Sequence, residues 1–130
     1  MHIKKILLLI IPVVLLVLNA CGLCQHTARP STKSLTFNSA GDSAVVTTRS
    51  TFWWISCFSI NEEYYCFFHN IDVTQPNYTI DTAGVTLERK NGTILKIKID
   101  SNPLSTIRTI IIELQEGDCQ ESITVTQKAG

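Results

Sequence analysis

The chain has 130 residues, and its eleven Lys and Arg side chains balance eleven Asp and Glu side chains, so the formal net charge at pH 7 is zero. This length suits one domain around a single core. Without a basic field, the chain lacks the electrostatic attraction on which nucleic-acid partners depend. The charge balance therefore excludes a nucleic-acid-binding role, and the length leaves no room for a second domain of ordinary size.

The first part of the chain has the pattern of an export signal. Lys4 and Lys5 precede an apolar run at residues 6–18, which is shorter than the roughly 20 residues that a membrane-spanning helix needs. We expect residues 1–20 to be a signal peptide that is removed on export. The alternatives are an ordinary signal peptide cut at another position and an uncleaved anchor helix, and both also place the domain outside the cytoplasm.

The apolar run ends in Leu18-Asn19-Ala20-Cys21, which resembles a lipobox, the motif at which a bacterial signal peptidase cuts before a lipid-modified cysteine. Acyl chains on Cys21 would attach the protein to a membrane without a spanning segment. The mature chain has nine Lys and Arg against eleven Asp and Glu, a formal charge of −2. We predict a lipid-anchored protein of the bacterial cell envelope, at the outer membrane, in a leaflet that the sequence leaves open.

Two regions follow this signal. Residues 21–34 are polar, contain several Ser and Thr and predict a flexible tether. From residue 35 to residue 130, short runs of alternating apolar and polar residues are separated by turn signals such as Asn91-Gly92, and the run at residues 94–99 is the clearest. About seven to eight short strands without a window of helical period predict an antiparallel β-sandwich.

Four cysteines remain in the mature chain besides the lipidation site, which agrees with export to an oxidising compartment. A hairpin centred on Asn61-Glu62 places Cys57 directly opposite Cys66. We therefore predict a disulfide between these two residues. The same reasoning finds no partner for Cys24 or for Cys119.

Catalytic chemistry finds little support in the sequence. The chain contains no G-x-S-x-G, no HExxH and no Gly-rich phosphate loop. Glu62 and Glu63 are adjacent, so their side chains diverge and would not flank one glycosidic bond. A zinc site made of Cys57, Cys66 and His69 lacks a fourth ligand at the usual spacing. We predict a protein without catalytic activity, metal or cofactor.

Several segments together match a family pattern. Those near the C-terminus are Ile97-x-Ile99-x-x-Asn102, Arg108-Thr109-Ile110-Ile111-Ile112 and Ile123-x-Val125-x-Gln127, and those before them are Leu35-Thr36-Phe37, the Gly41 turn and Trp53-x-Ile55. In this order they resemble BACON domains, the immunoglobulin-like modules of exported Bacteroidetes proteins, over residues 34–129. The resemblance implies an immunoglobulin-like β-sandwich and an association with carbohydrate or mucin. The chain departs from the family where a second Trp and a Gly-rich stretch are common, since it has Tyr64-Tyr65-Cys66-Phe67-Phe68 there.

Three polar residues of this pattern have expected structural roles. Asn102 suits a turn, and Gln127 is able to bond backbone groups at a strand end. Arg108 could satisfy loop carbonyls or pair with a carboxylate such as Asp100. Because side-chain hydrogen bonds go mostly to backbone or water, we interpret these residues as structural rather than as ligand contacts.

The aromatic residues carry the functional question, because nine of the ten lie between Phe52 and Tyr78. Strand alternation divides this region into two faces. The face expected to point into the core carries Trp53, Ile55, Cys57, Tyr64, Cys66 and Phe68. The opposite face carries Phe52, Trp54, Phe58, Tyr65 and Phe67.

The aromatic residues on the outward face are either exposed or covered. Exposed rings stack on sugar faces or are buried by a partner protein, and on this view the candidate ligand-binding residues are Phe52, Trp54, Tyr65 and Phe67. Alternatively, the loop at residues 70–84 is long enough to cover this face. Two functions therefore compete. One is a binding module for carbohydrate or mucin-type glycans, and the other is a spacer or protein-interaction domain of an envelope complex.

Overall fold

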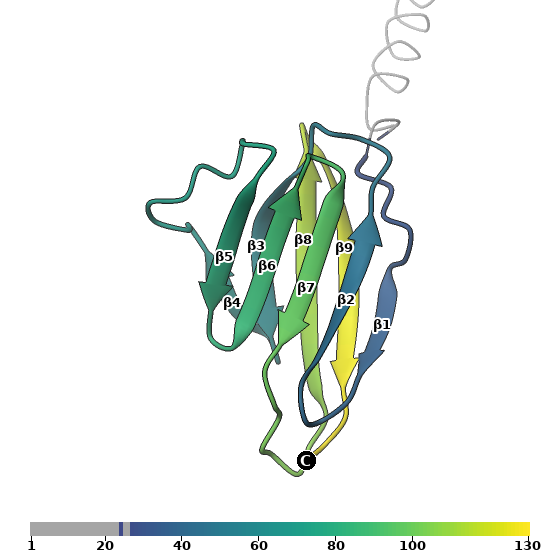
Figure 1. Cartoon of the computed structure of the whole chain (residues 1–130), viewed down its shortest axis with the longest axis vertical. Coiled ribbons are helices and arrows are strands. Elements are labelled where there is room, and N and C mark those ends of the chain that lie inside the picture. The colour runs from purple at the N-terminus through teal and green to yellow at the C-terminus, as the bar shows by residue number, and fades with distance from the viewer. Residues whose placement is uncertain (1–23, 25–26) are drawn as a thin grey trace, which may run out of the picture.

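The computed structural model describes Cys24 and residues 27–130, so the predicted signal peptide at residues 1–20 and the predicted lipidation site Cys21 lie outside the described residues. The described part forms nine strands and no helix (Figure 1). The strands are β1 (Ser34–Phe37), β2 (Asp42–Thr47), β3 (Trp54–Ile60), β4 (Glu63–Cys66), β5 (Tyr78–Thr82), β6 (Val85–Lys90), β7 (Ile94–Ile99), β8 (Arg108–Glu116) and β9 (Cys119–Gln127). No helix in this part of the chain is therefore long and apolar enough to span a membrane.

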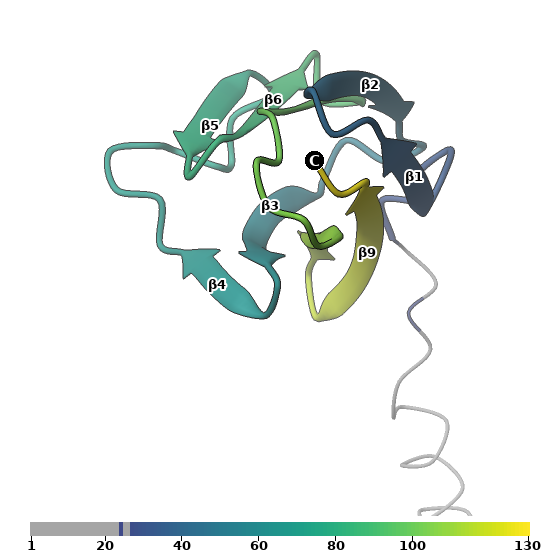
Figure 2. The same ribbon diagram turned by 90° about the horizontal axis from the view of Figure 1, so that it is seen from below.

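The strands form two sheets that pack face to face. Over the described residues, one sheet has five strands in the order β1-β9-β8-β3-β4, and the other has four in the order β2-β7-β6-β5. Figure 2 shows the two layers facing each other, with the chain crossing between them from β1 to β2 and from β4 to β5. The predicted immunoglobulin-like β-sandwich is confirmed. One described pairing departs from the antiparallel prediction, because β1 runs parallel to β9.

Strand alternation builds the core as the sequence pattern predicts. In β7, Leu95, Ile97 and Ile99 are buried, whereas Lys96 and Lys98 lie on the other face. Burial of one such aliphatic side chain contributes about 1.5 to 3 kcal/mol. Equivalent inward rows on β6, β8 and β9 complete a core that lies between the sheets, and its members include Val85, Leu87, Ile110, Ile112, Leu114, Ile123 and Val125.

Strand β5 was not predicted, because its residues fell within the expected loop at 70–84. Its sequence, Tyr78 to Thr82, has one fully buried aliphatic residue, Ile80, between exposed polar neighbours. Such a strand lies at a sheet edge and pairs with β6 alone. A single apolar residue is too weak a period-2 signal to identify the strand from sequence.

A β-bulge in β3 overturns the predicted assignment of faces. The pairing of β3 with β8 shifts register between Ile55 and Cys57, so Ser56 is an extra residue in the strand. An extra residue reverses the alternation beyond it. Trp53 and Ile55 are buried as expected. The next side chain buried in the core is that of Phe58, whereas strict alternation predicted that of Cys57.

The consequences of the bulge extend to β4. Cys57 pairs with Glu113 on β8 and with Cys66 on β4, so both cysteines lie on the outer face of the five-stranded sheet. Tyr64, expected in the core, shares that outer face and is exposed. Tyr65, expected outside, lies opposite Phe58 and packs against the core.

The disulfide between Cys57 and Cys66 is present as predicted, with the two Cα atoms 4.5 Å apart. Their registered positions in the hairpin were correctly predicted, because the turn at Asn61 and Glu62 alone sets that register. Both thiols are consumed in this bond. The alternative zinc site, which needed Cys57 and Cys66 as ligands together with His69, is therefore wrong.

The segment predicted to be a tether belongs in part to the domain. Ala28 is only 1% exposed and packs in the core. The amide of Arg49 donates to the carbonyl of Ala28 at 3.0 Å, and the amide of Ser31 donates to the carbonyl of Thr47 at 2.8 Å. The predicted boundary at residue 35 is therefore too late, because the backbone from residue 28 onward bonds to β2, to the loop after it and to β9. The polar composition of this segment does not predict its attachment to the domain, because backbone groups make most of these hydrogen bonds.

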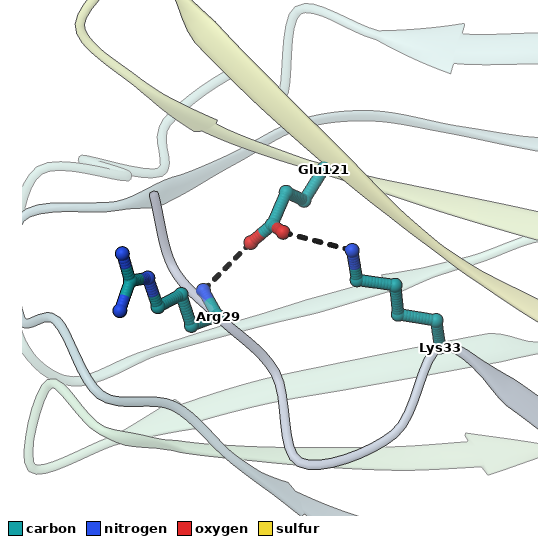
Figure 3. Close-up of polar contacts among 3 residues, drawn as sticks. All are labelled: Arg29, Lys33 and Glu121. Atoms are coloured by element: carbon teal, nitrogen blue, oxygen red, sulfur yellow. Dashed lines mark hydrogen bonds and ion pairs between the residues drawn. The ribbon is translucent and has the colours of Figure 1, made fainter. Parts of the chain in front are cut away.

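Glu121 on β9 also fastens this segment to the sandwich. Its carboxylate accepts a hydrogen bond from the backbone amide of Arg29 at 2.6 Å and lies 3.0 Å from the ammonium of Lys33 (Figure 3). Partial burial on its own would raise the pKa of Glu121. The bonds from Lys33, from the amide of Arg29 and from the hydroxyl of Thr27 outweigh burial and hold that pKa below its usual value.

We expect acid to loosen the docked N-terminal segment. A carboxyl group whose pKa is lowered in the folded state stabilises that state fully above its unfolded pKa of about 4.3, and the contribution is lost as the pH falls through the lowered value. The protection of the Arg29 amide, which is the exchange rate of unstructured chain at the same pH divided by the observed rate, should therefore fall below about pH 4 and stay constant above about pH 5. The Glu121→Gln variant should exchange faster at neutral pH and lose the acid dependence. Acid-independent protection in the wild type would contradict this assignment.

Candidate binding surface

The four predicted ligand-binding aromatics do not form one platform. Phe52 lies in the loop before β3 and is 79% exposed, and Phe67 follows β4 and is 86% exposed. Trp54 is half-buried at the start of β3. Tyr65 faces the interior, where its ring stacks on Phe58 with the centroids 5.0 Å apart. The prediction that these rings share one exposed face is therefore wrong, because the bulge in β3 separates Trp54 from Tyr65.

Tyr65 instead helps to close the margin of the sandwich between β4 and β5. Phe58 stacks on Tyr65 and, with a centroid distance of 6.2 Å, on Phe68. Ile71 of the following loop packs against the same core, and Figure 2 shows this loop leading from β4 across to β5. Desolvation, followed by the nearby Glu63 carboxylate, raises the pKa of Tyr65. The loop expected to cover the outer face therefore packs against the core and leads across to the other sheet.

The outer face of the five-stranded sheet carries a different set of side chains from the one predicted. Ser59 lies in register between Tyr64 on β4 and Ile111 on β8. Toward the start of β3, the disulfide lies beside Glu113, and Trp54 lies beside Gln115. The Tyr64 side chain is 63% exposed. The exposed ring of this face is thus Tyr64, which sequence reasoning had placed in the core.

A shallow hollow lies on this face near the hairpin end. Its volume is about 410 Å³, and it is lined by Ser59, Asn61, Glu62, Thr109 and Ile111. The turn beside it is firmly held, because the amide of Thr109 donates to Asn61 Oδ1 at 2.9 Å and the amide of Asn61 donates to the carbonyl of Thr109 at 2.9 Å. The lining offers hydroxyl, amide and carboxylate groups beside one aliphatic surface.

This arrangement places a flat ring beside polar side chains. A ring beside convergent polar groups can stack on the apolar face of a ligand while those groups bond its hydroxyls or amides. Glu62 and Glu63 are both exposed to solvent. Among the described residues, no three His, Cys, Asp or Glu side chains gather closely enough to hold a metal ion.

Three polar residues that match the family pattern bind backbone groups just beyond the ends of β1, β7 and β9. Gln127 is buried and donates to the carbonyls of Asn38 and Asp100 at 3.0 and 2.9 Å. Arg108 donates to Gln127 Oε1 and to the carbonyl of Asp100. Asn102 donates to the carbonyls of Thr106 and Lys128. Their predicted structural role is confirmed, with Arg108 satisfying a loop carbonyl and not the carboxylate of Asp100.

Arg89 is a buried cation that sequence reasoning missed. It is 2% exposed, and its guanidinium lies over the Trp53 ring at 4.5 Å from the centroid. It donates to the carbonyl of Thr51 at 2.6 Å and to that of Gln75 at 2.8 Å, so it ties two loops together. Burial lowers its pKa. The sequence held one indication of this burial, because Arg89 alternates with the same period as the buried Val85 and Leu87. An arginine at the end of a strand is nevertheless expected to be exposed.

Tyr78 supports the same region. Its hydroxyl accepts a hydrogen bond from the amide of Ile55 at 3.0 Å, next to the bulge in β3. Burial raises the pKa of this phenol. The ring of Tyr78 also faces the Arg89 guanidinium, 6.0 Å from its centroid. Trp53, Arg89 and Tyr78 therefore form one stacked group that holds the start of β3.

Comparisons with known proteins support the fold and go no further. No family model matches the chain, and no curated protein matches it in sequence. Among solved structures, the chain is similar to an NMR structure of a protein from Bacteroides thetaiotaomicron, with a TM-score of 0.62 and 15% sequence identity. The match covers 85% of this chain and 92% of that one. At this identity the similarity establishes the shared β-sandwich alone.

Proposed function

We propose that this protein is a lipid-anchored, non-catalytic binding domain of the bacterial cell envelope, of the BACON type, and that it binds carbohydrate. The proposed site is the outer face of the five-stranded sheet, around Tyr64 and the hollow lined by Ser59 and Asn61. The observation that carries the proposal is the 63% exposure of the Tyr64 ring beside that hollow. Mucin-type glycans are the ligand class that the family resemblance suggests.

The physical chemistry of the face supports a neutral ligand. Tyr64 supplies a flat apolar surface next to Ser59, its register partner, and the polar residues Asn61 and Thr109 line the adjoining hollow. The mature chain has a formal charge of −2, so long-range attraction to an anionic ligand is absent. Because the turn is held by two hydrogen bonds, little ordering accompanies binding, which preserves affinity.

A protein-interaction function is the second candidate, and Phe67 favours it. Phe67 is 86% exposed, its own backbone has a positive φ of 57°, and its side chain has no polar group. A fully exposed phenyl ring is an anchor of the kind that a partner protein buries at an interface. Here the partner would be another component of an envelope complex.

Alanine substitution at Tyr64 tests the carbohydrate proposal. We expect Tyr64→Ala to weaken glycan binding by about 1 to 3 kcal/mol, or roughly 5- to 150-fold, because a stacked ring lies at the centre of the proposed site. Binding should be measured first on a glycan array and then by calorimetry with the glycan that binds best. Phe67→Ala is the matched control and should retain binding.

The outcomes separate the two functions. Glycan binding that is lost with Tyr64→Ala and kept with Phe67→Ala supports the proposal. Capture of a defined envelope protein that depends on Phe67 supports the interaction function instead. If no glycan binds the wild-type protein, the carbohydrate proposal is wrong.

A further inference from the structure

A second disulfide lies where the chain approaches its proposed lipid anchor. Cys24 is bonded to Cys119, and their Cα atoms are 5.4 Å apart. Cys119 is the first residue of β9, directly after the turn that leaves β8. Cys21 precedes Cys24 by three residues, a length of chain that spans at most about 11 Å when fully extended. An acyl group on Cys21 would therefore stay close to this end of the sandwich.

We call this end the anchor end and define it by the Cys24–Cys119 disulfide, the loop at residues 48–53 and the turn at residues 91–93. Hydrogen bonds join these parts, because the amide of Thr48 donates to the carbonyl of Thr93 at 2.9 Å. Ser50 donates to the Glu116 carboxylate at 2.6 Å, which links the 48–53 loop to the end of β8. The anchor end is thus one connected surface.

Phe52 lies on this surface. Its side chain is 79% exposed, although its own amide is held by the hydroxyl of Ser50 at 3.1 Å. A fixed backbone with a free phenyl ring is an arrangement suited to contact with an apolar phase. The charges nearby are mixed, since exposed Arg49 and Lys90 are accompanied by exposed Asp118. Electrostatic attraction to anionic lipid is therefore not the main source of contact.

The other end of the sandwich points away from the anchor. Figure 1 places the C-terminus at the end opposite the β8–β9 turn, and the amide of Gly130 donates there to the carbonyl of Leu104 at 2.8 Å. The turn at Asn61 and Glu62, which borders the proposed carbohydrate site, follows the far end of β3. Seven residues of β3 separate this turn from the anchor end, a length of about 20 Å at 3.3 Å per residue.

We propose that the anchor end is a membrane-apposed surface, on which the Cys24–Cys119 disulfide holds the domain against the leaflet that carries the lipid and Phe52 enters the lipid interface. Aromatic rings favour this interface, and a ring placed there adds to the attachment by the acyl chains. The strands then run outward, and the Tyr64 site is presented away from the lipid. This inference rests on the lipid anchor of the proposed function.

A depth measurement tests this orientation. The acylated full chain would be reconstituted in vesicles of phosphatidylethanolamine and phosphatidylglycerol that contain lipid brominated on its acyl chains, a short-range quencher of tryptophan. We expect the emission added by Phe52→Trp, relative to wild type, to be largely lost in these vesicles. Ile107→Trp is the matched control, because Ile107 is 59% exposed and lies near the opposite end, and its added emission should persist.

Removing the Cys24–Cys119 disulfide gives a second measurement. In the Phe52→Trp background, replacing both Cys24 and Cys119 with serine lengthens the free chain between lipid and domain, so quenching should decrease. Unchanged quenching would overturn the role of the disulfide. Equal quenching at both tryptophan positions, or none at position 52, would overturn the orientation. If mass spectrometry finds no lipid on Cys21, the proposed anchor is wrong, whereas acylated protein without quenching contradicts this inference alone.

Discussion

Replacing Cys24 and Cys119 together with alanine should lower the free energy of unfolding by about 4 to 5 kcal/mol, according to the chain-entropy description of disulfides. The bond joins residues 95 positions apart, so it closes almost the whole domain into one loop. A loop of that length removes more entropy from the unfolded chain than a short one. Urea denaturation under oxidising conditions would measure the effect, and a steeper dependence on urea should accompany it because the opened chain exposes more surface on unfolding.

The other disulfide provides the comparison. Cys57 and Cys66 are nine positions apart, and the same relation assigns their bond about 3 kcal/mol. The Cys57→Ala and Cys66→Ala double variant should therefore be the more stable of the two double variants. The reverse order would show that residues 24 and 27–33 detach before the sandwich unfolds, so that the long loop does not constrain the unfolding transition.

Trp53→Ala should cost about 3 to 5 kcal/mol, a large part of the 5 to 15 kcal/mol that stabilises a typical domain. Trp53 is 1% exposed, and its indole N–H donates to Thr48 Oγ1 at 2.8 Å. Its removal also uncovers the buried guanidinium of Arg89, which stacks on the ring. The loss therefore combines a large cavity with a buried charge that has lost its neighbour. Chemical denaturation monitored by circular dichroism would measure it.

Trp54→Ala is the natural control for this experiment, because the adjacent residue is half-buried on the outer face. Its expected cost is about 1 kcal/mol or less. Trp53→Phe should fall between the two variants, since it keeps a ring beneath Arg89 but loses the hydrogen bond to Thr48. Equal and severe destabilisation by both alanine variants would contradict the assignment of the two tryptophans to opposite faces.

The assignment of the aromatic residues to the inner and outer faces could be predicted only in part from the sequence. Alternation along β3 correctly placed Trp53 and Ile55, and the turn at Asn61-Glu62 correctly set the register of Cys57 and Cys66. The error began at Ser56, where the bulge inserts one residue. Nothing in the residues around Ser56 marks a bulge, because its position depends on how β3 pairs with β8, more than fifty residues later. One unseen residue exchanged the environments of Tyr64 and Tyr65.

The sequence by itself determined the class of fold, the strands of the core and the hairpin disulfide, because alternating polarity and turn residues act over a few neighbouring positions. Only the tertiary structure decided which aromatic rings are exposed, that Arg89 is buried beneath Trp53, and that Cys24 pairs with Cys119. Each of these depends on contacts between residues distant in the chain. Short-range patterns carry no information about such contacts, since packing of one sheet against the other brings the partners together.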